Sequence, residues 1–209
     1  MTYDGLVSRY LNRPLSRPVA RGLRPTPLTP NQVTTFTLLL AVATGAMIAA
    51  GWNIAGGIAI QAVSVIDGVD GELARLKDRA TRFGGVFDAV SDRYADAIML
   101  AGMTVYAVRF EDYPRPEFVG ALALGAALIV SYSRARIEAD LPDVAASGNL
   151  DSVFGLASRD VRLLVAAIGT VLGQCYWTLI ILAAVSGLTI AWRLLYLRIT
   201  VGGRRLPPA

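Results

Sequence analysis

The sequence contains no histidine among its 209 residues and only one cysteine, Cys175. Without histidine, the commonest general base and the commonest zinc ligand of proteins are excluded. A single cysteine excludes an intramolecular disulfide, and we expect Cys175 to serve as a small, buried apolar residue. Acid–base or metal chemistry must therefore rest on carboxylates, whose oxygen atoms suit Mg²⁺, Mn²⁺ or Ca²⁺.

Charged residues are also scarce, at 17% of the chain, whereas 54% is hydrophobic. The N-terminal segment lacks the apolar core and small-residue cleavage site of a secretory signal peptide. Long apolar stretches instead recur along the whole chain, which is typical of an integral membrane protein. We predict an all-α integral membrane protein with six transmembrane helices. They cover about residues 31–51, 54–78, 84–108, 116–137, 159–175 and 176–198, with a loop at 138–158.

Residues 1–30 form a separate basic segment ahead of this six-helix domain, which spans 31–198. Four arginines recur at every fourth position and would share one helical face: Arg9, Arg13, Arg17 and Arg21. We predict an amphipathic interfacial helix over 3–23, followed by a proline-rich linker; a solvated basic tail is the alternative. Thr29 should cap the first span, with Pro30 at its first helical position. Residues 199–209 should form a C-terminal tail.

The distribution of lysine and arginine predicts the orientation. In a six-span arrangement both termini, the 75–82 turn and the loop after the fourth span lie on one side, together with most basic residues. The opposite side has only Arg109 and Arg115, beside Glu111, Asp112 and Glu117. We therefore expect a multi-pass protein of the cell (inner) membrane with both termini on the cytoplasmic side.

Small residues recur at four-residue spacing within two of the predicted spans. They are Ala41, Gly45 and Ala49, and then Gly169 and Gly173. Such spacing lets helices approach closely, either within one bundle or between two subunits. We favour packing within one bundle.

One segment, residues 67–92, concentrates charge between two apolar stretches. Asp67 and Asp70 share one helical face, and Asp88 and Asp92 share another. Four carboxylates meeting at the cytoplasmic membrane edge would repel each other, and two divalent cations would balance their charge. A solvated acidic helix face is the less probable alternative, and a calcium EF-hand is excluded because the required ligands and glycine are missing.

Small residues accompany these aspartates on the same faces. Gly71, Ala74 and Gly84 leave room for a ligand to approach the backbone, and Arg75 can hold a phosphate with its guanidinium group. A membrane transporter that uses aspartates remains an alternative of a different class. It is disfavoured because the cluster lies at helix ends and no repeat of it occurs later in the chain.

The segments DGVDGELAR and GGVFDAVSD resemble the signature of the class I CDP-alcohol phosphotransferase family, D-x2-D-G-x2-A-R-x8-G-x3-D-x3-D, in all eight fixed positions. The resemblance implies an enzyme that transfers a phosphoalcohol from a CDP-linked donor to an alcohol, releasing CMP. It implies that Asp67, Asp70 and Asp88 hold two Mg²⁺ or Mn²⁺ ions, and that Asp92 joins them and acts as the general base. The residues implied to bind the CDP moiety are Gly71, Ala74, Arg75, Gly84 and Asn31.

Further basic residues lie on the predicted cytoplasmic side, outside this signature. In family members with a phosphorylated acceptor, such residues line the acceptor pocket, which implies this role for Arg134, Arg136, Arg159 and Arg162. Ordinary flanking of membrane spans by positive charge is the alternative. Asp96 lies outside the signature, so Asp96→Asn should impair the reaction much less than Asp88→Asn, unless it destabilises the bundle.

The resemblance is greatest to the membrane domain of di-myo-inositol phosphate phosphate synthases, which implies CDP-inositol as donor and inositol 1-phosphate as acceptor. The alternatives are phosphatidylinositol phosphate synthase and phosphatidylglycerophosphate synthase, both of which use CDP-diacylglycerol. The expected partners are these substrates, membrane lipids, a second copy in a homodimer and a separate cytidylyltransferase, with no nucleic acid. The alternative to a separate cytidylyltransferase is that the chain is a fragment of a longer bifunctional protein.

Overall fold

The computed structural model describes residues 7–146 and 158–201. These residues are almost entirely helical, and no strand occurs among them, which confirms the all-α prediction. A short π-helical segment, η1, precedes the first α-helix. The elements are η1 (Ser8–Asn12), α1 (Arg13–Leu23), α2 (Pro30–Ala49), α3 (Asn53–Leu76), α4 (Arg82–Phe110), α5 (Pro116–Asp140), α6 (Pro142–Ala146), α7 (Arg159–Val171) and α8 (Cys175–Thr200).

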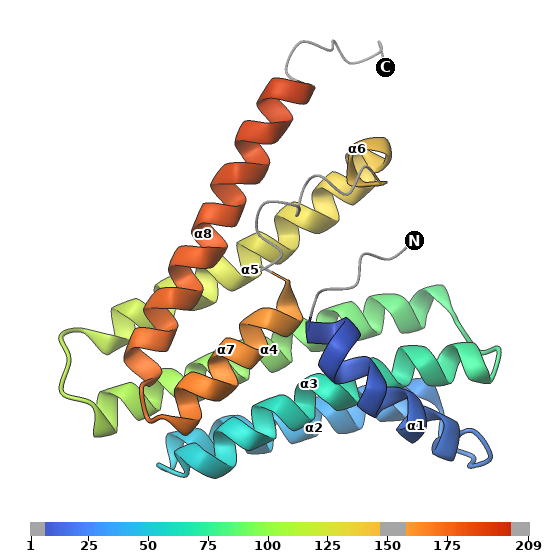
Figure 1. Ribbon diagram of the computed structural model, residues 1–209, viewed down its shortest axis with the longest axis horizontal. Helices are drawn as coiled ribbons and strands as arrows, with labels where there is room; N and C mark the ends of the chain where they lie inside the picture. The colour runs from blue at the N-terminus through green and yellow to red at the C-terminus, as the bar shows by residue number, and fades with distance from the viewer. Residues whose placement is uncertain (1–6, 147–157, 202–209) are drawn as a thin grey trace.

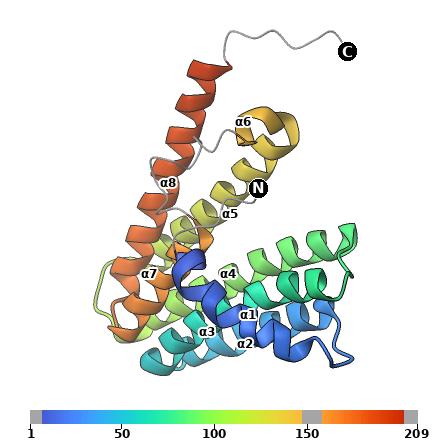
Figure 2. The same cartoon turned by 45° about the vertical axis from the view of Figure 1, so that its right-hand side comes forward.

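The long helices form two groups that diverge from a common end. Helices α3 and α4 both pack against α2, and α1 lies across α3. Helices α5 and α8 pack along each other and rise away from the first group, as Figures 1 and 2 show from two directions. The short helix α7 packs on both α3 and α8 and so joins the two groups.

Four of the described helices are long and apolar enough to cross a membrane: α2, α3, α5 and α8. Helix α4 has 29 residues, but its first half carries the charged cluster. Helix α7 has only 13 residues, or about 20 Å at the usual rise of an α-helix, and the hydrocarbon core is about 30 Å thick. The fifth predicted span is thus shorter than expected, because its helix ends at Val171 and not at residue 175.

Other predicted boundaries are confirmed or corrected. The cap of α2 is confirmed: the Gln32 backbone N–H donates to Thr29 Oγ1, the Thr29 N–H donates to the Gln32 side chain, and Pro30 opens the helix. The predicted loop at 138–158 is wrong in its first part, because α5 continues to Asp140 and α6 follows at once. Helix α8 likewise extends into the predicted tail. The remaining parts of these predictions fall on 1–6, 147–157 and 202–209, outside the described residues.

The N-terminal helix is held on α3 by polar and small side chains. Asn12 donates to Ser64 Oγ over 2.9 Å and accepts from Gln61 over 2.9 Å. One turn on, Ser16 is buried against Gly68, where an added Cβ would lie at ordinary contact distance, 3.4 Å, from the Ser16 hydroxyl. The opposite face of α1 exposes apolar side chains, including Leu15 and Val19, and arginines. A helix is thus present where the amphipathic helix is predicted, and its place at a membrane interface stays a prediction.

The small residues of α2 serve contacts inside one chain. Helices α2 and α4 cross where Gly45 and Gly102 meet: a Cβ on Gly102 would lie 2.8 Å from Gly45 Cα and closer still to its carbonyl oxygen. Gly169 similarly admits the Thr178 side chain between α7 and α8. Packing within one bundle is therefore confirmed for these glycines. Cys175 is fully buried, as predicted.

We expect Gly102→Ala to destabilise the bundle, because the added methyl group would press on the backbone of α2, which cannot rotate away. Overpacking of this kind typically costs about 1–3 kcal/mol. Thermal unfolding of the purified protein in detergent should show a lower Tm for this variant.

The matched control is Gly125→Ala in α5, where the added Cβ would have nothing within 4 Å. Alanine is the better helix former, so this variant should be neutral or slightly more stable. Equal Tm values for the two variants would show that the contact between α2 and α4 is looser than described.

Candidate active site

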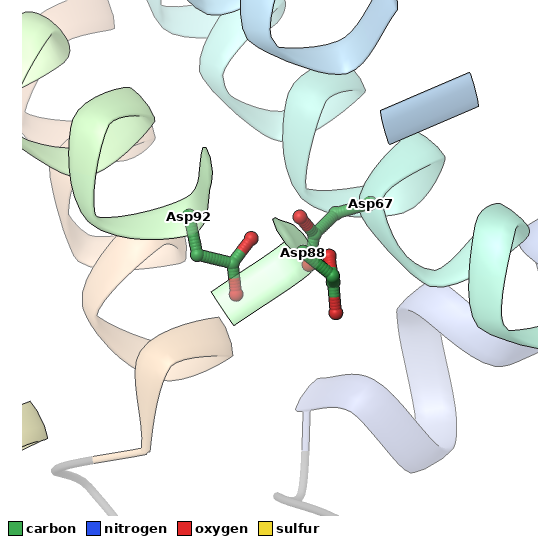
Figure 3. Close-up of side chains that lie close together, drawn as sticks. All are labelled: Asp67, Asp88 and Asp92. Carbon is green, nitrogen blue, oxygen red and sulfur yellow. The ribbon is translucent and has the colours of Figure 1, made fainter. Parts of the chain in front are cut away.

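Aspartates of two helices, α3 and α4, converge on one site. Asp67 comes from α3, and Asp88 and Asp92 come from successive turns of α4. One carboxylate oxygen of each lies within 4.8 Å of the others, and Figure 3 shows the three side chains pointing toward one another. The predicted meeting of the two acidic faces is thereby confirmed for these three residues.

The fourth predicted aspartate, Asp70, lies one turn after Asp67 and is only 6% exposed. Its carboxylate accepts hydrogen bonds from Thr34 Oγ1 on α2 and from the Gly71 backbone N–H, the latter at 2.5 Å. Asp70 is outside the group of three but lines the same cavity. Thr34 therefore fixes the position of this carboxylate, a contact that the sequence pattern does not reveal.

A cavity of about 620 Å³ extends from the aspartates between the two helix groups. One side is acidic and bears Gly71 and Arg75 as well. The other side is basic, with arginines contributed by α4, α5, α7 and α8: Arg93, Arg134, Arg159, Arg162 and Arg193. Part of the wall is formed by η1 and α1, through Asn12, Arg13 and Ser16. The cavity thus brings opposite charges together over a space large enough for a small polar molecule.

Arg159, the first residue of α7, connects the acidic and basic sides. Its Nη1 lies 2.5 Å from an oxygen of Asp67 and 3.1 Å from one of Asp92. Its Nε donates to Asp96, 3.0 Å away. These contacts supply positive charge to a group of carboxylates that would otherwise repel each other in a partly buried site. Among the described residues, Nη2 of Arg159 is buried without a hydrogen-bond partner.

Two other arginines, Arg162 and Arg193, are buried nearby, and Arg93 is half-buried. Arg162, one turn along α7, is 8% exposed, and its Nη1 has no hydrogen-bond partner within the described part of the chain. Arg193 of α8 donates to the Val130 carbonyl at 2.6 Å and to Ser133 at 2.9 Å. Arg93, next to Asp92, likewise keeps a buried Nε unpaired among the described atoms. Buried guanidinium groups with unused donors are suited to bind an anion.

Arg93 and Arg193 were missed by the sequence analysis. Arg193 falls within a mostly apolar helix and is 4% exposed. A cation inside a membrane helix indicates function by default, and that was the available signal. For Arg93 the sequence offered no signal of function beyond its position directly after Asp92.

The remaining predicted residues fall into two sets. Arg75 lines the cavity and pairs with Glu72 at 3.3 Å, and Glu72 also lies 3.6 Å from Arg17 of α1. Asn31 and Gly84 lie side by side, since a Cβ on Gly84 would be 3.2 Å from the Asn31 amide oxygen. These two residues and the half-buried Ala74 are not among the residues that line the cavity.

The two predicted acceptor arginines of α5 also differ in whether they line the cavity. Arg134 lines the cavity and pairs with Glu138 at 2.8 Å. Arg136 faces away from this wall, is not among its lining residues, and pairs with Asp140 at 2.8 Å. The structure therefore brings three of the four predicted acceptor residues to one cavity and leaves Arg136 outside it.

The aspartate group fits a hard divalent cation. Three carboxylates from two rigid helices offer oxygen ligands at a spacing that one ion, or two neighbouring ions, can bridge. No other group of three or more potential ligands of this kind is found among the described residues. Residues 27–199 match the protein-family model described as CDP-alcohol phosphatidyltransferase.

The chain belongs to this family. It is a CDP-alcohol phosphotransferase, and enzymes of the family depend on a divalent metal. The transporter alternative is thereby set aside. A bifunctional IPC transferase and DIPP synthase from Rubrobacter xylanophilus is 41% identical over 201 residues, which cover 93% of this chain but 43% of the relative. The phosphotransferase therefore spans less than half the length of that relative.

A second relative corresponds over nearly its full length. The phosphatidylinositol phosphate synthase of Mycobacteroides abscessus is 30% identical over 213 residues, covering 98% of this chain and 93% of the relative. Among solved structures, the Mycobacterium tuberculosis phosphatidylinositol phosphate synthase in complex with manganese and citrate aligns with a TM-score of 0.76 at 26% identity. That alignment covers 92% of this chain and 93% of the other.

We expect Asp88→Asn to abolish turnover, because an amide replaces one of three convergent carboxylates at the metal site. Activity, measured as CMP release from a CDP-linked donor, should fall by more than about a hundredfold. We also expect Mn²⁺ to raise the Tm of the wild-type protein by binding the folded state and to raise that of the variant much less. Asp112→Asn, the same change at an exposed position between α4 and α5, is the control. Full activity of Asp88→Asn would contradict the assignment of this cluster.

Proposed function

We propose that the enzyme transfers phosphoinositol from CDP-inositol to inositol 1-phosphate, yielding di-myo-inositol phosphate phosphate and CMP. The observation that carries this proposal is the single cavity that joins the aspartate group to buried arginines. A CDP-linked donor needs the acidic side, and a phosphorylated acceptor needs the basic side. The 41% identity to a relative named as a DIPP synthase supports inositol as the alcohol.

The acidic side would hold the donor. Asp67, Asp70, Asp88 and Asp92 would bind two Mg²⁺ or Mn²⁺ ions, whose chemistry when bound is to neutralise charge on the pyrophosphate. Arg75 would contact a donor phosphate. Gly71, Ala74, Gly84 and Asn31 would shape the nucleotide pocket, and the proximity of Asn31 to Gly84 is consistent with a shared role.

The basic side would position the acceptor. Arg134, Arg159 and Arg162 would hold its phosphate, joined by Arg193, so that a hydroxyl points toward the donor. That hydroxyl oxygen forms a bond to the β-phosphorus while the bond from this phosphorus to the CMP oxygen breaks. CMP leaves with the electron pair, and Asp92 takes the hydroxyl proton. Asp92 is placed for this step because it lies where the acidic and basic sides meet, 3.1 Å from Arg159.

The proposed membrane arrangement is consistent with this placement. We propose that α4 and α7 complete six membrane-embedded helices with α2, α3, α5 and α8, and that α1 lies at the interface. The cavity, both termini and most arginines would face the cytoplasm, in accordance with the positive-inside rule. A soluble CDP-inositol donor, made by a separate cytidylyltransferase or by another part of a longer chain, would enter from that side. A homodimer is also proposed from the family resemblance.

A second candidate is phosphatidylinositol phosphate synthase, with a CDP-linked lipid as donor. It is favoured by the nearly full-length correspondence to the mycobacterial relative and by the likeness to a Mycobacterium tuberculosis structure with CDP-DAG bound, at a TM-score of 0.75 and 27% identity. The acceptor is the same in both reactions, so the two candidates differ in the donor alone.

A donor panel distinguishes them. The purified protein is incubated with inositol 1-phosphate, Mg²⁺ and either CDP-inositol or CDP-diacylglycerol in mixed micelles, and CMP release is measured. We expect the higher kcat/KM with CDP-inositol, and no turnover when excess EDTA is present. Faster turnover with CDP-diacylglycerol would establish the second candidate, and CMP release from neither donor would refute both.

We expect Arg162→Gln to raise the KM for inositol 1-phosphate while leaving the donor KM unchanged. Losing one charge-assisted contact with a phosphate costs about 1.5–3 kcal/mol, or about ten- to a hundredfold in KM. Arg136→Gln is the matched control, since its guanidinium lies outside the cavity. Equal effects of the two variants on acceptor KM would show that the basic side does not bind the acceptor as proposed.

A further inference from the structure

Asp96 lies one turn beyond Asp92 on the same face of α4, and it is 8% exposed. It does not belong to the group of three potential metal ligands, and it falls outside the family signature. Its carboxylate instead points to α7. One oxygen accepts the Nε–H of Arg159 at 3.0 Å, and the other lies 3.8 Å from Nη2 of Arg162.

These contacts reduce the electrostatic repulsion between the two arginines. Arg159 and Arg162 lie on successive turns of one short helix, and both side chains are largely buried. Two guanidinium groups held close together without a counterion repel each other. Asp96 supplies one negative charge between them, and it does so from a helix other than their own.

The contacts also determine which donors remain available. Nη1 of Arg159 is engaged by Asp67 and Asp92, and Nε is engaged by Asp96. Within the described chain, Nη2 of Arg159 and Nη1 of Arg162 are left without hydrogen-bond partners. Both arginines line the large cavity. Without Asp96, the Nε edge of Arg159 would be free to turn toward the metal-site carboxylates.

We propose that Asp96 is a positioning residue that holds Arg159 and Arg162 as a pair for binding the acceptor phosphate. It touches neither substrate nor metal and acts through the two arginines. This inference rests on the proposed function, since it requires a phosphorylated acceptor. It assigns to Asp96 a role that the signature does not, and it predicts a stronger effect of substitution than the sequence pattern suggests.

Asp96→Asn tests the proposal, because it preserves shape and can still accept from Arg159 Nε but removes the charge. The acceptor KM should rise about tenfold or more, while the donor KM, the Mg²⁺ requirement and the Tm remain close to those of wild type. The double variant Asp96→Asn/Arg162→Gln should raise acceptor KM by less than the product of the single effects. Asp112→Asn serves as the charge-matched control.

A purely structural role would lower Tm and kcat and leave both KM values unchanged, and this result would overturn the proposal. So would multiplicative effects in the double variant. A rise in the Mg²⁺ requirement would instead make Asp96 a metal-site residue. Titration of the wild type and Asp96→Asn with inositol 1-phosphate or inorganic phosphate alone, followed by thermal shift, reports on the arginine pair without turnover. Weaker phosphate binding supports the proposal even if the donor assignment fails, and unchanged binding refutes it.

Discussion

The contact between Arg159 and the aspartates of α3 and α4 is the interaction on which the rest of the site depends. Taking several carboxylates out of water costs several kcal/mol per ion unless positive charge compensates them. Arg159 contributes that charge at 2.5 Å from Asp67 and 3.1 Å from Asp92. The requirement explains why α7 begins with this residue and why α7 packs on α3 as well as on α8.

The same need for charge compensation is reflected in the cavity, which has an acidic side and a basic side. Carboxylates gather on α3 and α4, and arginines gather on α4, α5, α7 and α8, so the polarity changes across one chamber. The proposed reaction between two phosphorylated substrates would benefit from this division, because each phosphate would have a separate counter-charge and the reacting groups would meet at the boundary. Arg159 lies at that boundary and belongs to both halves.

The local pattern of the sequence predicted the helices, the cap at Thr29 and the convergence of Asp67, Asp88 and Asp92. Each of these follows from spacing along one or two adjacent helices. Arg193 and Asp96 could not be assigned in this way. Arg193 joins Val130 and Ser133 from a helix about 60 residues away, and Asp96 pairs with a residue 63 positions later. Their roles depend on how the two helix groups meet, which no local period encodes. Arg136 was grouped with the acceptor residues because it stands close to Arg134 in the sequence. Its side chain does not line the cavity.

The docking of Arg159 also bears on how the protein is made. Asp67 precedes Arg159 by 92 positions, so the ribosome completes α3 and α4 long before their counter-charge exists. Asn12 is likewise synthesised before its hydrogen-bond partners Ser64 and Gln61, which follow about 50 residues later. The acidic faces of α3 and α4 are therefore present in the chain well before α7, which carries their counter-charge, is synthesised. The N-terminal segment can dock on α3 before then, and the candidate site is completed only by α7, one of the last helices to be made.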